Sequence, residues 1–521
     1  MRLIAIDWVV IVLACGLLLG VTIWTKRYVK GVADFTVAGR KVRVWLGLSA
    51  SSADGIAIAS VIAISQQSFE SGFSYMWLFF LSMLICVPLI GIYGFGIKRY
   101  RATGVQTLPQ YYEMRYSKGV RRVAGIAIAI GGVLNMAIFP MIAAEFLMVI
   151  LGLPDKIVFM GSQFDTTLTF VIILLVPSVF FALLGGFVTV VVTNYVQAII
   201  MAVAIFAVTW LALVKCGSSV KDVVDNIYAT LNTNIGSGAF NLFQKNSYGP
   251  VWIVFFIASN IYGVLSFPPS LAMTSGAENP EVARKMYLVR TIFNNGRMLC
   301  LVLWGICAMV VIGMAVPAGM DKQDLSRVAS AMLINKIVPP GLIGIVLIGL
   351  IFAETSTLSA YLLSWSTIIV NDVICSFREK PFTNQTHIRL LKMTVLSIAV
   401  FIFLWSIYYE QSESILTYQY LTGTIFTGAG IISFFGLYWK RTTTSAAYIA
   451  LVICMVVPMA DLFLKQHWHS IAFLSSYSES YPLRGEQSGL LAIVLAMIAI
   501  YAASIVSKDK TKFVNYGIGL K

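Results

Sequence analysis

The sequence consists largely of long apolar runs, and these runs restrict what the chain can fold into. A helix that crosses a bilayer needs about 20 mostly apolar residues. Thirteen runs of this kind occur, near residues 7–25, 45–66, 73–97, 123–151, 166–184, 187–214, 251–275, 298–316, 340–370, 391–409, 415–438, 444–464 and 488–507. Charged residues make up only 12% of the 521 residues, against about 25% in a soluble protein. We therefore predict an all-α polytopic membrane protein, with the lipid bilayer as its surroundings.

The basic residues alternate between loops in a way that predicts orientation. The chain has 37 Lys and Arg, 23 Asp and Glu, and a formal net charge of +14. If the N-terminus is outside, 27 basic residues fall in inner segments, including four at 284–297, and ten fall in outer segments. Cytoplasmic loops carry such an excess, so we expect the N-terminus outside and the C-terminus inside. A nucleic-acid partner would need a solvated basic domain, which the sequence does not contain.

Two of the thirteen spans are interrupted by residues that break helices. The span 45–66 contains LGLSASSADGIAIASVIAIS, with small and polar residues at its middle. The span 251–275 contains Asn260, Gly263 and the pair Pro268–Pro269. Unwound backbone at membrane depth is tolerated where it is buried or lines a cavity, and two such segments in matching places indicate a transporter site. Small-residue packing in the first span and a proline kink in the second are the alternative explanations.

The places of the two broken spans predict an internal repeat. The first opens a group of five spans over 45–214, and the second opens another five over 251–438. Because five is odd, the second group enters the membrane from the opposite side. We therefore expect an inverted 5+5 repeat, with peripheral spans at 7–25 and 444–507, within one membrane transporter domain over residues 1–521.

Three acidic residues fall inside predicted spans. Asp54 lies in the middle of the first broken span, Glu145 in the outer half of 123–151, and Glu354 in the middle of 340–370. An ionisable group inside a membrane is costly and usually functional. We expect these carboxyl groups to take part in ion or proton coupling; a structural hydrogen bond between helices is the alternative.

Five motifs, in order, resemble those of the sodium:solute symporter family, which has the LeuT-type fold. They are DFTVAGR (34–40), TLPQYYEMRYSKGVRR (107–122), GGFVTVVVTNYVQ (185–197), FAETSTLSAYLLSWSTIIVNDV (352–373) and FGLYWKRTTTSAA (435–447). The resemblance runs from the first span to about residue 450. It implies secondary active symport, in which inward cation flow drives uptake of a small polar organic solute by alternating access.

The resemblance also implies a sodium site between the first broken span and span 340–370. Its candidate ligands are the backbone carbonyls of Ser52, Gly55 and Ala353 and the hydroxyls of Ser356 and Thr357. The last three are spaced i, i+3 and i+4, so they share one face of a helix. Glu354 is expected roughly opposite that face and is not counted as a ligand.

One residue departs from the family pattern close to this site. The family has an Asp in its T-D-x-x-Q segment, and this chain has Asn194. The change removes a negative charge near the sodium site. We predict sodium as the coupling ion, and a proton-coupled or cation-independent transporter of the same fold is the alternative. The candidate coupling groups are Asp54, Glu145, Asn194 and Glu354.

The resemblance implies a solute cavity lined by the middles of the two broken spans and by their neighbours. The candidate solute contacts are Ser51, Asp54, Asn135, Asn260, Tyr262 and Tyr418. The stretch SASSADG resembles the proline-symporter branch of the family more than the sugar branch. An amino acid or other small amine or carboxylate is therefore favoured over a sugar, and the expected location is a bacterial cytoplasmic (inner) membrane.

Two other classes of function fit the sequence less well. A transport-inactive membrane sensor usually carries an appended signalling domain, and only 14 residues follow residue 507. An enzyme needs a nucleophile–His–acid set or a metal cluster, and no such arrangement is apparent. We therefore predict no catalytic residues and no cofactor other than the coupling ion.

Overall fold

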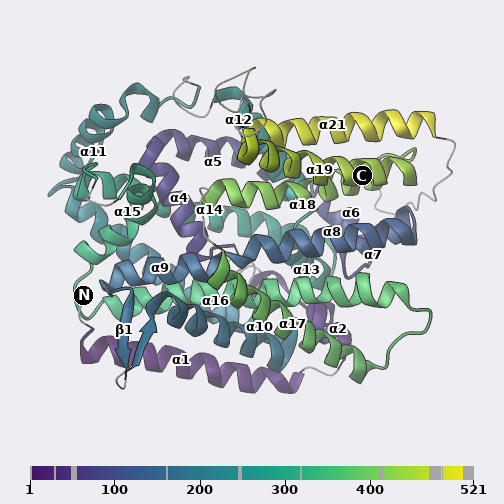
Figure 1. Ribbon diagram of the computed structural model, residues 1–521, viewed down its shortest axis with the longest axis horizontal. Helices are drawn as coiled ribbons and strands as arrows, with labels where there is room; N and C mark the ends of the chain where they lie inside the picture. The colour runs from purple at the N-terminus through teal and green to yellow at the C-terminus, as the bar shows by residue number, and fades with distance from the viewer. Residues whose placement is uncertain are drawn as a thin grey trace.

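The computed structural model describes residues 3–28, 31–47, 55–159, 162–243, 249–316, 320–409, 415–468, 483 and 485–507. Within these ranges the chain is a bundle of long helices that run roughly along one direction, with α1 (Ala5–Thr25) along one edge and α19 (Thr444–His467) and α21 (Gly485–Val506) along the other (Figure 1). The first half continues with α2 (Val32–Val37), α4 (Ile58–Ser71), α5 (Phe73–Cys86), η3 (Val87–Ile92), α6 (Ile97–Ala102), α7 (Leu108–Arg115), α8 (Lys118–Ala137), α9 (Phe139–Leu151) and α10 (Thr166–Cys216). The second half has α11 (Val220–Asn234), α12 (Gly249–Gly263), α13 (Pro268–Gly276), α14 (Pro280–Ile312), α15 (Lys322–Ile337), α16 (Ile343–Ile368), η5 (Ile369–Ile374), α17 (Asn384–Tyr408) and α18 (Ile415–Tyr438).

The long apolar helices follow the predicted spans. In the described residues, nine helices are long and apolar enough to cross a membrane, and α12 with α13 forms a tenth as a bent pair. The helix α10 has 51 residues, and at 1.5 Å per residue it is far longer than a bilayer of about 30 Å requires. It corresponds to the two predicted spans 166–184 and 187–214. The count of thirteen and the orientation remain predictions.

A glycine separates the two halves of α10. Gly186 has φ 53° and ψ −145°, outside the helical region. A Cβ added there would lie 2.5 Å from the ring of Phe35 in α2. Glycine is therefore required both for the positive φ and for the close approach of α2.

The predicted break in the second interrupted span is confirmed. The helix α12 ends at Gly263, α13 begins at Pro268, and the two helices are bent by 40°. Proline at the first position of α13 fits because that position needs no amide donor. In the first interrupted span, α4 begins at Ile58 after a turn at Gly55, and residues 48–54 lie outside the described residues.

Close backbone contacts hold the bundle together, as small residues permit in membrane helices. Gly344 in α16 packs against the backbone of Asp7 in α1. The buried Asp7 carboxylate accepts hydrogen bonds from the backbone nitrogens of Gly341 (3.1 Å) and Gly344 (2.7 Å). The peripheral helix α1 is thereby fixed to the first turn of α16.

Three features differ from the sequence prediction. The strands β1 (Lys156–Phe159) and β2 (Ser162–Asp165) pair antiparallel, and α11 and α15 occupy segments expected to be loops. The span predicted at 298–316 belongs to a helix that begins at Pro280. Arg290 and Arg297, counted above as inner-loop charges, therefore lie within α14.

Candidate ion and solute site

Three of the predicted sodium ligands come together on one face of α16. Ala353, Ser356 and Thr357 are all buried. The hydroxyls of Ser356 and Thr357 each donate to the backbone carbonyl of Ala353, at 3.0 Å in both cases. The arrangement concentrates neutral oxygen atoms, which suit a monovalent cation. Of the two other predicted ligands, Gly55 is described and Ser52 lies outside the described residues.

Glu354 faces the first broken span, contrary to the expectation that it lies opposite the sodium face. Its side chain is fully buried, and its Oε2 accepts a hydrogen bond from the backbone nitrogen of Ile58 at 2.9 Å. Its Oε1 is buried with no hydrogen-bond partner in the described part of the chain. Ile58 is the first residue of α4, so the carboxylate interacts with the positive end of that helix dipole.

Gly55 lies between α14 and α16. A Cβ added at Gly55 would be 3.4 Å from Asn294 Oδ1 and 3.6 Å from Arg290 Nη2, both in α14. On the other side, Ile56 lines the same small apolar cavity as Ala353. The break in the first span is therefore close to two polar side chains of α14, and the residue after Gly55 shares a small cavity with Ala353 of α16.

Those two α14 side chains line a cavity of about 430 Å³ between α5, α12, α13 and α14. One predicted solute contact, Asn260, is exposed and lines this cavity. Its Nδ2 donates to Phe256 O at 2.8 Å. Near the beginning of α5 the lining is aromatic: Tyr75 and Phe79 have ring centroids 5.1 Å apart, and Phe79 and Phe256 have centroids 5.7 Å apart.

The other described solute candidates lie elsewhere. Tyr262 directs its hydroxyl to Met497 Sδ in α21 (3.3 Å) and is not among the residues that line the cavity. Asn135 Nδ2 donates to Thr422 Oγ1 (2.6 Å), and Tyr418 donates to the carbonyl of Leu134 (2.7 Å). These two contacts join α8 to α18. Ser51 and Asp54 lie outside the described residues.

The remaining coupling candidates lie on different helices. Glu145 in α9 lies 4.0 Å from Arg327 in α15. Asn194 in α10 is fully buried. One turn further along α10, Gln197 Nε2 donates to Thr355 Oγ1 at 3.2 Å, beside the hydroxyl face of α16. Asn194, at the position where the family has an Asp, therefore lies on α10. This helix packs against α16 beside the hydroxyl face.

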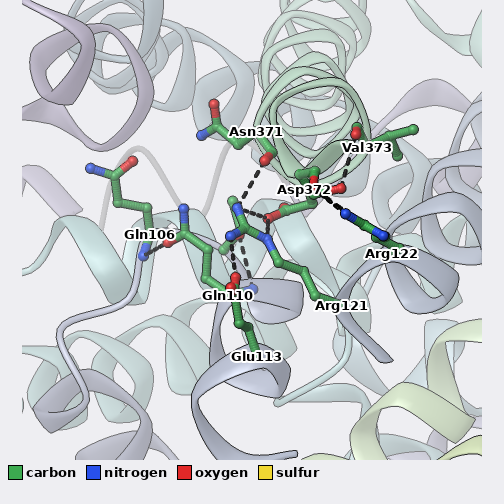
Figure 2. A network of polar contacts seen from close by, with 10 residues as sticks. Gln106, Gln110, Glu113, Arg121, Arg122, Asn371, Asp372 and Val373 are labelled. Atoms are coloured by element: carbon green, nitrogen blue, oxygen red, sulfur yellow. Dashed lines mark hydrogen bonds and ion pairs between the residues drawn. The ribbon is translucent and has the colours of Figure 1, made fainter. Parts of the chain in front are cut away.

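A buried ionic network was not predicted from the sequence. Asp372, in the π-helical turn η5 that follows α16, is fully buried and lies 2.8 Å from Arg121 Nη2 of α8 (Figure 2). Arg121 also pairs with Glu113 of α7 and donates to Asn371 O at 2.8 Å. Arg122 donates to Ser376 O at 2.7 Å. The sequence signals were Arg121 and Asp372 themselves, both within motifs that resemble the family, but their pairing is a long-range contact.

The described chain is a helical bundle with an interrupted membrane helix, a face of α16 that bears buried hydroxyls, and a cavity lined in part by polar side chains. Together these features define a secondary transporter of LeuT-type fold. The model of the Sodium:solute symporter family matches residues 35–454, and the chain belongs to this family. Sodium is the coupling ion of this class, and the chain is a multi-pass integral membrane protein that moves small solutes.

Individual relatives and structures agree with this classification. The chain is 22% identical over 495 residues to the sodium/glucose cotransporter of Vibrio parahaemolyticus, covering 88% of this chain and 85% of the relative. It is 23% identical over 550 residues to sodium/glucose cotransporter 1 of Oryctolagus cuniculus, covering 96% of this chain and 78% of the relative. Its fold matches a Na+-coupled sialic acid symporter in a substrate-bound outward-open state, with a TM-score of 0.80, 15% identity, and coverage of 98% of this chain and 99% of that one.

Proposed function

We propose that this chain takes up a small polar organic solute bearing an amine or a carboxylate together with sodium, across a bacterial cytoplasmic membrane. The observation that carries the proposal is the place of Gly55. A Cβ on Gly55 would lie beside cavity-lining residues of α14, and the next residue, Ile56, lines a small cavity together with Ala353, whose carbonyl is a proposed sodium ligand. An ion and a solute bound at these two places would both contact the interruption in the first broken span.

The proposed sodium ligands are the carbonyls of Gly55 and Ala353, the hydroxyls of Ser356 and Thr357, and the carbonyl of Ser52. The hydroxyls of Ser356 and Thr357 both donate to the carbonyl of Ala353 (3.0 Å each), which brings these three oxygen atoms close together on α16. A cation held by ligands from both the broken span and α16 stabilises the conformation in which the two segments are close. By linkage, a solute that prefers that conformation then binds more tightly.

The proposed solute contact with the clearest support is Asn260, because it lines the cavity. Sugar is the second candidate, favoured by the names of the two cotransporters that the chain resembles. The charged and amide side chains that line the cavity, Arg290 and Asn294 among them, support an ionised solute instead.

Proton coupling is the alternative to sodium coupling, and Glu354 is the group that favours it. A fully buried carboxyl group with one unpartnered oxygen in the described structure can hold a proton or an ion. The carboxylate form has its own support, since Ile58 N donates to it at 2.9 Å.

Uptake into proteoliposomes tests the proposal directly. A mixture of radiolabelled amino acids, amines, carboxylates and sugars is presented with an inward sodium gradient, with equal sodium on both sides, and with a proton gradient alone. We expect accumulation only with the sodium gradient, and no loss when a protonophore is added. Accumulation that ignores sodium and collapses with the protonophore would refute sodium coupling.

A further inference from the structure

The cavity between α12, α13 and α14 carries a guanidinium group whose charge is not balanced in the described structure. Arg290 of α14 lines the cavity and is partly exposed. Its Nη1 donates one hydrogen bond, to Ser270 Oγ of α13 at 3.0 Å. Arg290 takes part in none of the ion pairs found between described residues. No Asp or Glu is among the described residues that line the cavity.

The side chains around Arg290 present further hydrogen-bond donors. Asn294 lies one turn along the same helix, and its Oδ1 accepts from Arg297 Nη2 at 3.2 Å. That bond leaves the NH2 group of Asn294 as its available polar group. Ser259 of α12 also lines the cavity, and its hydroxyl is buried without a partner in the described residues. A guanidinium, an amide NH2 and a hydroxyl together fit a carboxylate, which accepts hydrogen bonds at both oxygens.

We infer that the transported solute is an organic anion whose carboxylate is bound by Arg290 and Asn294, and that this anion is required for sodium to bind tightly. This inference rests on the proposed function, because it concerns the same cavity and the same sodium site. It narrows the solute from amines or carboxylates to carboxylates.

The coupling follows from the position of Gly55. Arg290 Nη2 lies 3.6 Å from where a Cβ on Gly55 would be, and the carbonyl of Gly55 is a proposed sodium ligand. A guanidinium this close disfavours a second cation, since like charges a few ångströms apart repel strongly in a weakly solvated site. A carboxylate on Arg290 cancels that repulsion. Anion and sodium therefore raise each other's affinity by the same factor, as linkage requires.

Ligand-induced stabilisation of the purified full-length protein tests the inference without a known substrate. The probes are carboxylates from acetate to sugar acids and amino acids, each paired with its neutral amide, together with glucose and ethanolamine. Each is added with sodium chloride or with potassium chloride, and the melting temperature is measured, because a ligand that binds the folded state raises it. We expect carboxylates to stabilise the protein in sodium, and their amides to bind about 10- to 100-fold more weakly, as expected for a lost charge-assisted pair.

Three variants separate recognition from a structural role. Arg290→Gln is expected to abolish the preference for the carboxylate over its amide and to tighten sodium binding in the absence of solute by about fivefold or more. Ser270→Ala removes the hydrogen bond to Arg290 but keeps the charge, so both properties should remain. Arg284→Gln removes an arginine of the same helix that pairs with Glu281 and does not line the cavity, and it serves as the charge control.

The outcomes distinguish this inference from the proposed function. A neutral or cationic solute that stabilises the protein in sodium, with no carboxylate doing so, overturns the anion inference and leaves sodium symport intact. The inference is also overturned if Ser270→Ala reproduces Arg290→Gln, because Arg290 is then a tether between α13 and α14. If carboxylates bind equally in potassium and no solute is taken up with a sodium gradient, the proposed function fails as well.

Discussion

The substitution Gly305→Ala tests the contact between α14 and α4, the second half of the first broken span. A Cβ added at Gly305 would lie 2.1 Å from Ser65 O, 2.1 Å from Ser68 Oγ and 2.9 Å from the backbone nitrogen of Phe69. The Ser68 hydroxyl can rotate away, but the carbonyl and the nitrogen belong to the α4 backbone. To reach an ordinary contact of 3.4 Å, the two helices must separate by about 1 Å in a closely packed interior.

The expected cost is at the upper end of the range for overpacking. Extra methyl groups in a packed core cost about 1–3 kcal/mol, and two of the three obstructing atoms are backbone, so we expect about 3 kcal/mol. Gly296→Ala is the matched control in the same helix, because no atom lies within 4 Å of its added Cβ. Replacing an exposed helical glycine by alanine stabilises by about 1 kcal/mol. The two variants should therefore differ by about 4 kcal/mol.

Thermal unfolding in detergent, in buffer without sodium, measures this difference. Gly305→Ala should melt well below the unmodified protein and Gly296→Ala at or slightly above it. Sodium-driven uptake should fall for Gly305→Ala alone, because α4 carries the residues that follow Gly55. Equal melting temperatures for the two variants would contradict the reasoning, since the close approach of α14 and α4 would then be absent.

Three further changes probe the ionic network and the sodium site. Asp372→Asn should destabilise the protein by about 3 kcal/mol, because it leaves the largely buried guanidinium of Arg121 with one partner fewer. The double variant that adds Arg121→Gln should cost less than the sum of the two single changes. Strict additivity in thermal melts would contradict the pairing. Thr357→Ala should raise the sodium concentration for half-maximal uptake about five- to tenfold, because one ligand of the ion is lost. Ser364→Ala removes another buried hydroxyl of α16 and should leave that sodium concentration unchanged. Asn194→Asp restores a negative charge beside α16 and should lower that sodium concentration; an unchanged value in the uptake assay would show that residue 194 does not act on the sodium site.

Local sequence patterns predicted the elements of the fold well where a residue type permits only one backbone conformation. The Pro268–Pro269 pair and Gly263 identified the break between α12 and α13, because proline cannot donate a helical hydrogen bond. The i, i+3, i+4 spacing correctly placed Ala353, Ser356 and Thr357 together. The same helical geometry predicted Glu354 on the side of α16 away from the first broken span. Its long side chain instead reaches the first turn of α4, because residue spacing gives the direction of a side chain but not how far it extends.

The contacts between distant segments could not be predicted from sequence alone. Tyr418 and Asn135 were expected in the solute cavity because their helices contribute to it in this fold. The structure joins both residues to the α8–α18 interface, and their role as solute contacts stays a prediction. Which face of a helix turns toward a cavity depends on how its neighbours pack, and residue spacing within one helix does not reveal which neighbour each face meets.

Arg290 lies within α14, although the sequence pattern predicted a loop before the span at residue 298. Counting basic residues by loop is valid when the ends of spans are known, and the span was expected to begin at residue 298. Asn279 caps α14 through Val282 N at 2.9 Å, with Pro280 at the first helical position. Asn followed by Pro is a signal for a helix start, and using it places Arg290 in a helix and not in a loop. The guanidinium of Arg290 lines the cavity in the structure, and the cavity is where a partner for it can bind.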